Sequence, residues 1–377
     1  MEYKRLGDYI REVNVRNSDL RVAKPMGINI EKCFMPSVAN VIGTDLSVYK
    51  LVFRNQFACN LMHVGRDEKI PMAMHTDVNP IIVSPAYFVF EITKTKELLP
   101  EFLMMWFRRT EFDRNAWFYT DADVRGGLNK DALLDMRLPI PSIDRQREIV
   151  SKYETLSNRI RLNEQMIEKL EATAQALYRK MFVDGVDKEN LPEGWRIGKL
   201  TDIANYLNGI ACQQYETLEQ EFLPVLKIRE LSQGCCDNNS DHVEMAIPKE
   251  YVINNGDVIF SWSATLFIDI WCGGKCALNQ HLFKVSSEKY PKWFYFLWTQ
   301  KYIEEWKRLI SAKATSMGHI KREDLESAEV IIPSDDCMIE YDKMMSPIFD
   351  TYALKKQENL KLTELQSLLL ARMGNKI

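Results

Sequence analysis

The sequence lacks the short motifs that mark most enzyme active sites. It contains no GxGxxG, no P-loop, no HExxH and no Asn/Asp-Pro-Pro-Tyr motif of the kind that adenine methyltransferases use to hold a flipped base. The only Asn-Pro dipeptide, Asn79-Pro80, is typical of a turn. The five histidines, at positions 63, 75, 242, 281 and 319, have no triad spacing. We therefore expect a chain that is not a catalyst.

Metal-binding patterns are scarce too. Asp67-Glu68-Lys69 contains the acid-x-Lys triplet that a nuclease uses on a metal, but no second acid lies on a preceding strand, which favours a solvated loop. Cys272 and Cys276, with His281 nearby, are a candidate for part of a zinc site, but the sequence has no CxxC pair. The eight cysteines are spaced irregularly, which favours free thiols in a reducing compartment. The sequence therefore predicts no metal site in this chain.

Long apolar runs and an excess of positive charge are also missing. No apolar run is long enough to span a bilayer, and the first residues, Met1-Glu-Tyr-Lys-Arg, lack the apolar segment of a signal peptide. We expect a soluble, cytoplasmic protein without membrane contact. The net charge of −4 argues against a protein that coats nucleic acid nonspecifically, but it permits local basic patches.

What the sequence does contain is one internal repeat. A chain of 377 residues exceeds what one hydrophobic core usually serves. The repeat predicts two domains with a common frame, and the different residues between the matched positions predict two different working surfaces. Identical residues recur 192 positions apart at Trp106 and Trp298, Gly126 and Gly318, Leu133 and Leu325, Pro141 and Pro333, Ser142 and Ser334, Leu170 and Leu362, Leu177 and Leu369, and Met181 and Met373.

Each copy ends in a long helix with a coiled-coil seam. Between Arg145 and Met181, apolar residues recur at alternating steps of four and three, and Asn163 is the one polar residue in this register. The same register, moved by 192 positions, runs from Tyr341 to Met373 with a more polar middle. The residues predicted to pair the two helices are Leu156, Ile160, Asn163, Ile167, Leu170, Leu177, Ile348, Tyr352, Leu362 and Leu369.

Proline-marked stops divide the chain. Each helix follows an extended segment that ends in Pro-Ser, and Ser142 and Ser334 are the predicted N-caps. The sequence predicts strands over 49–53, 81–83, 87–92, 257–261 and 281–285. It also predicts buried helices over 100–107 and 293–298, each followed by charged turns. The domains are therefore expected to be α+β. The predicted boundaries are a first domain over 1–144, a helix over 145–182, a linker over 183–194, a second domain over 195–336 and a C-terminal helix over 337–377.

In this layout, and in several stretches, the chain resembles the specificity subunit of type I restriction–modification systems. The resemblance covers essentially the whole chain, and its specificity lies in the doubled order of the stretches. The second helix departs from the pattern, since it begins with Asp335-Asp-Cys-Met where the first has Ile143-Asp-Arg-Gln, so its contacts are expected to differ. The stretches are Tyr49-Lys-Leu-Val-Phe-Arg-Asn-Gln-Phe-Ala-Cys-Asn, Ile82-Val-Ser-Pro-Ala-Tyr-Phe-Val-Phe, Leu138-Pro-Ile-Pro-Ser-Ile-Asp-Arg-Gln-Arg-Glu-Ile-Val, Leu191-Pro-Glu-Gly-Trp, Asn255-Gly-Asp-Val-Ile-Phe-Ser, Leu278-Asn-Gln-His-Leu and Ala314-Thr-Ser-Met-Gly-His-Ile.

The resemblance implies two target-recognition domains, each of which reads one half of a bipartite site in double-stranded DNA. It implies that the helices pack antiparallel, hold the domains apart and dock two copies of an adenine methyltransferase subunit, with ATP-dependent restriction subunits joining for cleavage. S-adenosylmethionine, ATP and Mg would serve those partners, with no cofactor in this chain. A helix over 145–181 is about 55 Å long, more than one DNA turn of about 35 Å.

Contact with DNA needs base-edge donors and acceptors, and Arg, Lys, Ser or Thr for phosphates. From Lys301 to Arg322 there are six basic and two acidic residues, the best basic patch of the chain. Trp117, Phe118 and Tyr119 can stack on a base, and core packing is their alternative role. The predicted contacts in the first domain are Arg54, Asn55, Asn60, His63, Arg66, Lys69, Arg125, Asn129 and Lys130. Those in the second are Ser261, Ser263, Thr265, Lys275, Asn279, Gln280, His281, Lys313, Thr315, Ser316, His319 and Lys321.

Two functions of other classes stay open. A non-DNA-binding scaffold protein, with a helical rod joining two protein-binding domains, would share the repeat and the heptads, but it would not need the polar, basic loops that follow the glycines. A catalytic nuclease or methyltransferase would need the motifs that are missing. The DNA sequence recognised does not follow from the residues, because it depends on loop geometry and DNA shape.

Overall fold

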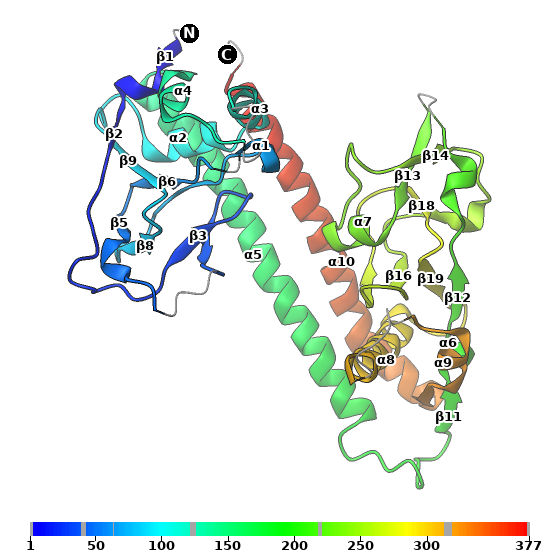
Figure 1. Ribbon diagram of the computed structural model, residues 1–377. Coiled ribbons are helices and arrows are strands. Elements are labelled where there is room, and N and C mark those ends of the chain that lie inside the picture. The colour runs from blue at the N-terminus through cyan, green and yellow to red at the C-terminus, as the bar shows by residue number, and fades with distance from the viewer. Residues whose placement is uncertain are drawn as a thin grey trace. The chain divides into compact units, whose positions relative to one another are not determined.

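The computed structural model describes residues 3–38, 43–62, 64–120, 126–217, 221–312 and 319–374, without the side chains of 66, 311 and 312 (Figure 1). The chain forms two compact units: Met1–Asn158 with Thr363–Ile377, called unit 1, and Arg159–Leu362, called unit 2. Each unit therefore contains one mixed domain and part of both long helices.

Unit 1 is built around a four-stranded antiparallel sheet. The sheet has the order β2-β9-β6-β7, made of Ile10–Glu12, Phe88–Ile92, Phe57–Cys59 and Met72–Met74. Three strand pairs surround it: β1 (Tyr3–Arg5) with β10 (Arg137–Pro139), β3 (Met26–Ile28) with β4 (Phe34–Pro36), and β5 (Lys50–Val52) with β8 (Ile81–Val83). Its short helices are η1 (Leu6–Asp8), η2 (Leu46–Val48), α1 (Val64–Asp67), α2 (Pro100–Phe107), α3 (Thr110–Phe118) and α4 (Lys130–Asp135).

The core of unit 1 lies between this sheet and α2. Phe57 and Phe90, on neighbouring strands, stack with ring centroids 5.0 Å apart, and Phe107 of α2 meets both rings edge-on. Pro100 occupies the first turn of α2, where its missing N–H has no intrahelical partner to lose. The helix is apolar on nearly every side because the sheet and the start of α5 cover it together.

Unit 2 repeats the central sheet with the same order. The strands β12-β19-β16-β17 are Asn205–Asn208, Leu282–Ser286, Val258–Ser261 and Phe267–Ile270. A second sheet has the order β14-β13-β18-β15, made of His242–Glu244, Phe222–Leu226, Cys276–Leu278 and Val252–Ile253, and β11 (Arg196–Lys199) pairs with β20 (Glu329–Ile332). The helices are α6 (Leu200–Ile203), η3 (Cys212–Tyr215), α7 (Ile228–Gln233), η4 (Lys249–Tyr251), α8 (Lys292–Ala312) and α9 (Arg322–Ser327).

One predicted element is wrong. The charged turns expected after Trp298 do not form, because α8 continues as one helix to Ala312. The apolar positions Ile303 and Trp306 extend its buried face. On the outer face, Lys301 pairs with Glu305 at 3.2 Å, so the charges that suggested turns support the helix instead.

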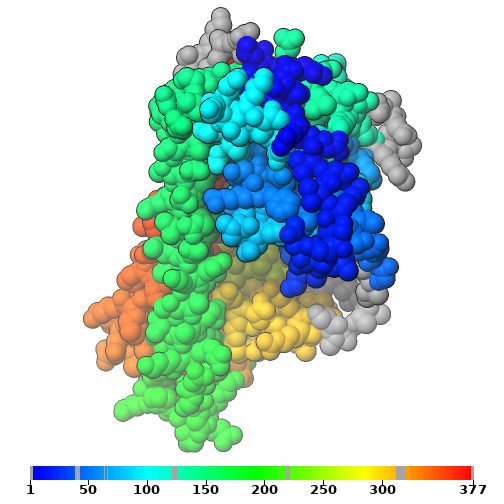
Figure 2. Space-filling view, turned by 90° about the vertical axis from the view of Figure 1, so that its left-hand side faces the viewer, coloured from blue at the N-terminus to red at the C-terminus, as the bar shows by residue number. Residues whose placement is uncertain are grey.

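The long helices are α5 (Ile143–Phe182) and α10 (Asp335–Arg372). Their serine N-caps are confirmed: Ser142 Oγ accepts from Arg145 N and Ser334 Oγ from Cys337 N, both at 3.4 Å. The outer side of α5 is open to solvent (Figure 2, green). The register within each unit shows which way the two helices run.

The helices run antiparallel in both units. In unit 2, Asn163 Nδ2 donates to Asn359 Oδ1 at 2.8 Å. In unit 1, Gln366 Nε2 donates to Ser157 Oγ at 2.7 Å, so residue numbers fall along α5 as they rise along α10. The predicted fold of two repeated α+β domains with an antiparallel pair of long helices is confirmed.

The two domains are joined to the helices by different contacts. In unit 1, the buried Gln146 of α5 accepts from Leu99 N at 2.9 Å and donates to Glu97 O at 2.6 Å. The matching position in α10 is Met338, and in unit 2 Asp342 accepts from Trp293 Nε1 at 2.8 Å instead. The altered sequence at the start of the second helix therefore corresponds to a different attachment.

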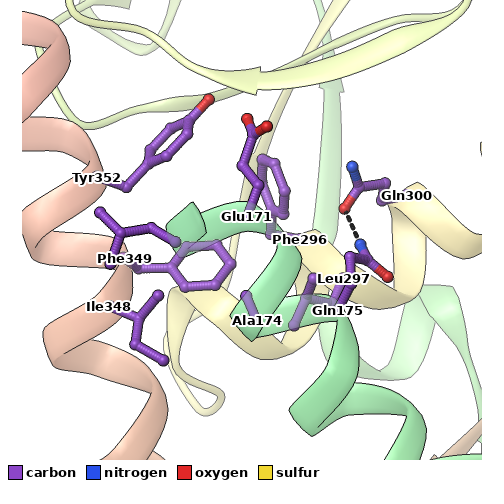
Figure 3. Close-up of a pocket in the computed structure, with 10 residues that line it drawn as sticks. Glu171, Ala174, Gln175, Phe296, Leu297, Gln300, Ile348, Phe349 and Tyr352 are labelled. Atoms are coloured by element: carbon purple, nitrogen blue, oxygen red, sulfur yellow. Dashed lines mark hydrogen bonds between the residues drawn. The ribbon is translucent and has the colours of Figure 1, made fainter. Parts of the chain in front are cut away.

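The attachment in unit 2 leaves a small cavity among α5, α8 and α10 (Figure 3). Ala174, Phe296 and Phe349 supply its apolar walls, one from each helix. At its edge Gln175 Nε2 donates to Gln300 Oε1 at 2.6 Å, which ties α5 to α8. The helix pair thus holds the longest helix of the second domain directly.

Candidate nucleic-acid interface

Both units bring the same two separate segments together at one end of the central sheet. In unit 1, Leu128 N donates to Leu61 O at 2.8 Å, which joins the segment before α4 to the loop after β6. In unit 2, Ile320 N donates to Trp262 O at 3.0 Å, which joins the segment before α9 to the loop after β16. Leu128 and Ile320 are 192 positions apart, so the repeat places one such junction in each domain.

A glycine pair builds the junction of unit 1. Gly65 N donates to Gly126 O at 2.7 Å, and a Cβ on Gly126 would lie 2.5 Å from Gly65 Cα. Gly126 also has φ +55°, a conformation that favours glycine. Only glycine at this position lets the two segments touch.

The predicted contacts of the first domain fall into two groups. Asn60, Lys69, Asn129 and Lys130 belong to the junction segments or to the loop between β6 and β7. Arg54 and Asn55 lie in the turn at the other end of β6, where Asn55 has φ +65° and donates to His75 O at 2.8 Å. A single contact with one short stretch of a DNA groove would not reach both the residues near the junction and those in the turn at the other end of β6.

Several of these side chains already have partners within unit 1. Asn129 Oδ1 caps α4 by accepting from Asp131 N at 2.8 Å, and Asn60 Oδ1 accepts from Met62 N at 3.0 Å. Lys130 pairs with Glu12 and lies 4.9 Å from the centroid of Phe88. Lys69 is exposed. His63 and Arg125 lie outside the described residues, as does the side chain of Arg66.

The junction of unit 2 centres on a residue that sequence reasoning missed. The half-buried ring of Trp262 lies 6.0 Å from His281, 5.9 Å from His319 and 5.8 Å from Phe283, between ring centroids. Its Nε1 donates to Asn208 Oδ1 at 3.1 Å, which fixes the indole. In the sequence, the only sign of a role for Trp262 was its place between Ser261 and Ser263. The two histidines beside its ring lie far from it in the sequence, so they gave no indication.

A cleft of about 1,090 Å³ opens beside Trp262. Its rim carries three basic side chains, Lys289, Lys321 and Arg322, against the acidic Asp202 and Glu288. Burial raises the pKa of Tyr206, whose hydroxyl makes a 2.6 Å bond with Thr299 Oγ1 and so faces the core. The cleft is therefore lined by aromatic and basic groups, whereas the Tyr206 hydroxyl is directed away from the cleft toward the core.

Three predicted contacts of the second domain are buried. Ser261, Ser263 and Asn279 are at most 4% exposed. Asn279 N donates to Leu226 O at 3.2 Å, and a Cβ on Gly209 would lie 2.2 Å from Asn279 O. Ser261 Oγ donates to Ser263 O at 3.3 Å. These residues support the segments that carry Trp262 and His281, so we leave them out of the interface.

The remaining predicted contacts lie at different distances from the junction. His281, His319 and Lys321 are exposed at it, while Gln280 is half-buried and donates from its N to Ile210 O at 2.9 Å. Thr265 is exposed in the β16–β17 turn, and Lys275 is exposed between β17 and β18. Lys313, Thr315 and Ser316 lie outside the described residues.

The basic patch from Lys301 to Arg322 is weaker than its composition suggests. Lys301 pairs with Glu305 at 3.2 Å, and Lys307 pairs with Glu304 at 2.9 Å. Arg322 pairs with Glu326 at 3.3 Å, although its side chain is 87% exposed. The described cations nearest the junction are therefore Lys321 and Arg322.

The predicted helix-pairing residues lie on the facing sides of α5 and α10. Asn163 is buried against Asn359, and Leu156, Ile160, Ile167 and Leu362 are half-buried. Leu177, Ile348 and Tyr352 pack on the core of unit 2, Leu369 packs on that of unit 1, and Leu170 lines the cavity of Figure 3. The Arg159–Glu358 ion pair beside the seam, at 2.6 Å, was not predicted.

Other sequence candidates are resolved by their surroundings. Trp117, Phe118 and Tyr119 are 47%, 78% and 51% exposed, so core packing, their alternative role, is wrong. All eight cysteines are free thiols. Within the described ranges, no three His, Cys, Asp or Glu side chains gather as metal ligands. None of the helices described is long and apolar enough to cross a membrane.

A family model for the type I restriction modification DNA specificity domain matches residues 72–172 and 192–364. The chain belongs to this family. One matched stretch falls in each copy of the repeat, and the prediction of a type I specificity subunit is confirmed.

Named relatives agree with this assignment. The chain is 24% identical to the type I restriction enzyme MjaIX specificity subunit of Methanocaldococcus jannaschii over 277 residues, 67% of this chain and 64% of that protein's length. It is 20% identical to the HindI specificity subunit of Haemophilus influenzae over 378 residues, 79% of this chain and 82% of that protein. The crystal structure of a type I restriction–modification S subunit from M. genitalium matches with a TM-score of 0.58 at 11% identity, over 100% of this chain and 96% of that one, which shows a shared fold.

Proposed function

We propose that this chain is the sequence-specific DNA-binding subunit of a type I restriction–modification complex. Each domain reads one half of a bipartite site, and the helix pair sets the unspecified spacer between the halves. The observation that carries the proposal is the doubled junction, with Leu128–Leu61 in one domain and Ile320–Trp262 in the other. Family membership supports DNA as the ligand.

The junctions have the chemistry that groove reading requires. Sequence is read by hydrogen bonds and apolar contacts to base edges, and register is fixed by cations on phosphates. In the second domain we assign base contact to Trp262, His281 and His319, and phosphate contact to Lys321 and Arg322. In the first domain Asn129 and Lys69 are the matching candidates. The different residues at equivalent places fit two different half-sites.

We assign catalysis to partner subunits. Two copies of an adenine methyltransferase would dock on the helices and the adjoining domain faces, and ATP-dependent restriction subunits would join them. Leu162 and Met166, one helical turn apart on the open side of α5, are 52% and 44% exposed and offer an apolar contact. S-adenosylmethionine, ATP and Mg would be bound by those partners.

The decisive experiment separates recognition from catalysis. The purified chain should neither methylate nor cleave DNA, and sequence-specific methylation should appear when an adenine methyltransferase partner and S-adenosylmethionine are added. Methyl transfer by the isolated chain would contradict the proposal. Absence of DNA binding both alone and with the partner would favour the scaffold protein instead.

The modular division is tested by exchange. Replacing residues 1–140 with the matching domain of a relative should change one specified block of the methylated sequence and leave the other intact. Methylome sequencing reports both blocks at once. A change in both blocks would show that the domains do not read independently.

A further inference from the structure

A buried ion pair in unit 1 is itself closed to DNA, because both of its side chains are covered by the protein. Lys32 and Asp113 are 4% and 7% exposed, and Lys32 Nζ lies 2.6 Å from Asp113 Oδ1. Lys32 sits in the tight turn between β3 and β4, with φ +62°, a place where a lysine side chain would normally extend into water. Burial lowers the pKa of Lys32, while Asp113 opposes that shift.

The pair holds both backbone polar groups of one residue. Lys32 Nζ donates to Ile70 O at 3.2 Å, and Asp113 Oδ1 accepts from Ile70 N at 3.1 Å. Ile70 is fully buried. A buried ion pair adds little to stability by itself, because desolvation offsets the attraction, so its role is better sought in what it positions.

Ile70 is the next-to-last residue of the loop that joins β6 to β7, and this loop forms half of the junction in unit 1. The loop is closed at its base by the 2.9 Å bond from Asn60 N to Pro71 O. It meets the segment before α4 through Leu61 and Gly65. The Lys32–Asp113 pair is therefore a third attachment of the loop, at Ile70.

The second domain shows why the first needs this attachment. Its equivalent loop between β16 and β17 covers only residues 262–266, whereas the loop in the first domain covers 60–71. A longer loop loses more conformational entropy when it is fixed in one shape. Lys32 and Asp113 offset that loss by bonding to the backbone of Ile70. Because they bond to the backbone, they place no demand on which side chains the loop carries.

We propose that Lys32 and Asp113 are positioning residues for recognition: by fixing Ile70 they set the shape of the 60–71 loop, and so decide which bases the first domain accepts without touching DNA. This inference rests on the proposed function. It predicts that loss of the pair relaxes one half-site, whereas a merely stabilising pair would leave sequence preference unchanged.

The test uses the full chain with both charges replaced, Lys32→Met with Asp113→Leu, since removing both partners avoids a lone buried charge. Hydrogen exchange should become at least about 10-fold faster for amides 64–70, while β9 stays protected. In the methylating complex, discrimination at one or more positions of the first block should fall about 10-fold, with the second block unchanged. The matched control is Lys284→Met with Asp257→Leu, a half-buried pair of unit 2 at 2.9 Å whose other hydrogen bonds join Val252 O and Asn254 N. It should alter neither block.

The outcomes are distinguishable. Unchanged exchange in the loop, or fast exchange with an unchanged first block, overturns the inference. If the double variant does not fold, Lys32→Met with Asp113→Asn, which leaves no buried charge and keeps an acceptor for Ile70 N, is used for the same two measurements. Hydrogen exchange needs no DNA, so a protected loop in the variant refutes the inference even where the methylation assay fails. Failure of the wild-type complex to methylate specifically counts against the proposed function alone.

Discussion

Single polar residues within the helix seam matter more for register than for strength. Asn163 is 2% exposed and bonds Asn359 across the pair, where leucine would bury more apolar surface. In coiled coils a buried asparagine lowers stability but restricts the helices to one alignment. The bond therefore accounts for one register of α5 against α10 within unit 2.

Replacing both residues, Asn163→Leu with Asn359→Leu, should raise the free energy of unfolding by about 1 kcal/mol or more and raise the melting temperature, because apolar side chains replace a buried amide pair. The same variant should methylate sites with more than one spacer length. Calorimetry and methylome sequencing measure the two effects. Higher stability with an unchanged single spacer would show that the amides do not set the register.

Beside the seam, Glu358 gives the helix pair a pH-dependent contact. Hydrogen bonds from Arg159 and Lys355 lower the pKa of Glu358 to about 2. A carboxyl whose pKa is depressed on folding contributes stability above its unfolded pKa of about 4.3, and that contribution is lost as the pH falls through about 2. Glu358→Gln should therefore lose less stability than the wild type between pH 5 and pH 2, as measured by urea unfolding. Parallel losses would contradict this. At pH 7 the effect should be below about 1 kcal/mol, since the pair is solvent-screened.

At the proposed DNA-reading junction of unit 2, substitutions of Trp262 and Lys321 should affect DNA binding differently. Trp262→Ala should weaken binding to the second half-site about 10- to 100-fold, whereas Trp262→Phe should keep most of the affinity, because the indole N–H is already used by Asn208. Lys321→Ala should weaken binding to all DNA sequences alike. It should also reduce the slope of log affinity against log salt concentration by about 1. Titrations at several salt concentrations separate the two. A uniform loss in Trp262→Ala would place the ring outside the sequence-reading surface.

At the scale of elements, the glycine contact at the junction of unit 1 can be isolated. Gly126→Ala should destabilise unit 1 by about 1–3 kcal/mol and weaken binding to the first half-site. The reason is that a Cβ would clash with Gly65 and that the backbone has φ +55°. Gly127→Ala is the matched control, since its Cβ would meet Leu61 O at an ordinary 3.7 Å. Thermal unfolding of both variants compares them directly. Equal stability would mean that the segments need not touch.

The long helices were predictable because their signals are local. The heptad seam and the serine N-caps fixed α5 and α10 to within two residues at their starts. The length of α8 was missed because Lys301 and Glu305, which pair along the helix, resemble a charged turn when only composition is considered. Pattern alone does not separate solvated turns from the outer face of a helix.

The candidate site was predicted less well than the fold. Several of the predicted polar residues lie near the junctions, and their contact with DNA stays a prediction, but Asn279 and Ser261 are buried supports. Trp262 was missed, because its surroundings come from His281 and His319, which approach only through strand pairing. Whether a polar side chain faces DNA or the core depends on such nonlocal contacts, which spacing in the sequence does not carry.

For the whole molecule, the helix pair should control distance alone. One heptad inserted into α5 near residue 161, with one inserted opposite it in α10, lengthens the pair by about 10 Å and keeps the seam in register. The unspecified spacer should grow by about three base pairs while both blocks keep their identity. Methylome sequencing reads spacer and blocks together. An altered block would mean that the helices also shape the recognition surfaces.

The make-up of unit 1 has a consequence for synthesis on the ribosome. Its core includes Met373, the residue that follows α10, and Tyr3 OH donates to Gly374 O at 2.8 Å. The first domain emerges early but lacks these contacts until some 370 residues have been translated. Unit 2 is a continuous stretch and has no such delay. The domain made first is therefore the one completed last, and until then the apolar surface that Met373 covers stays open to chaperones.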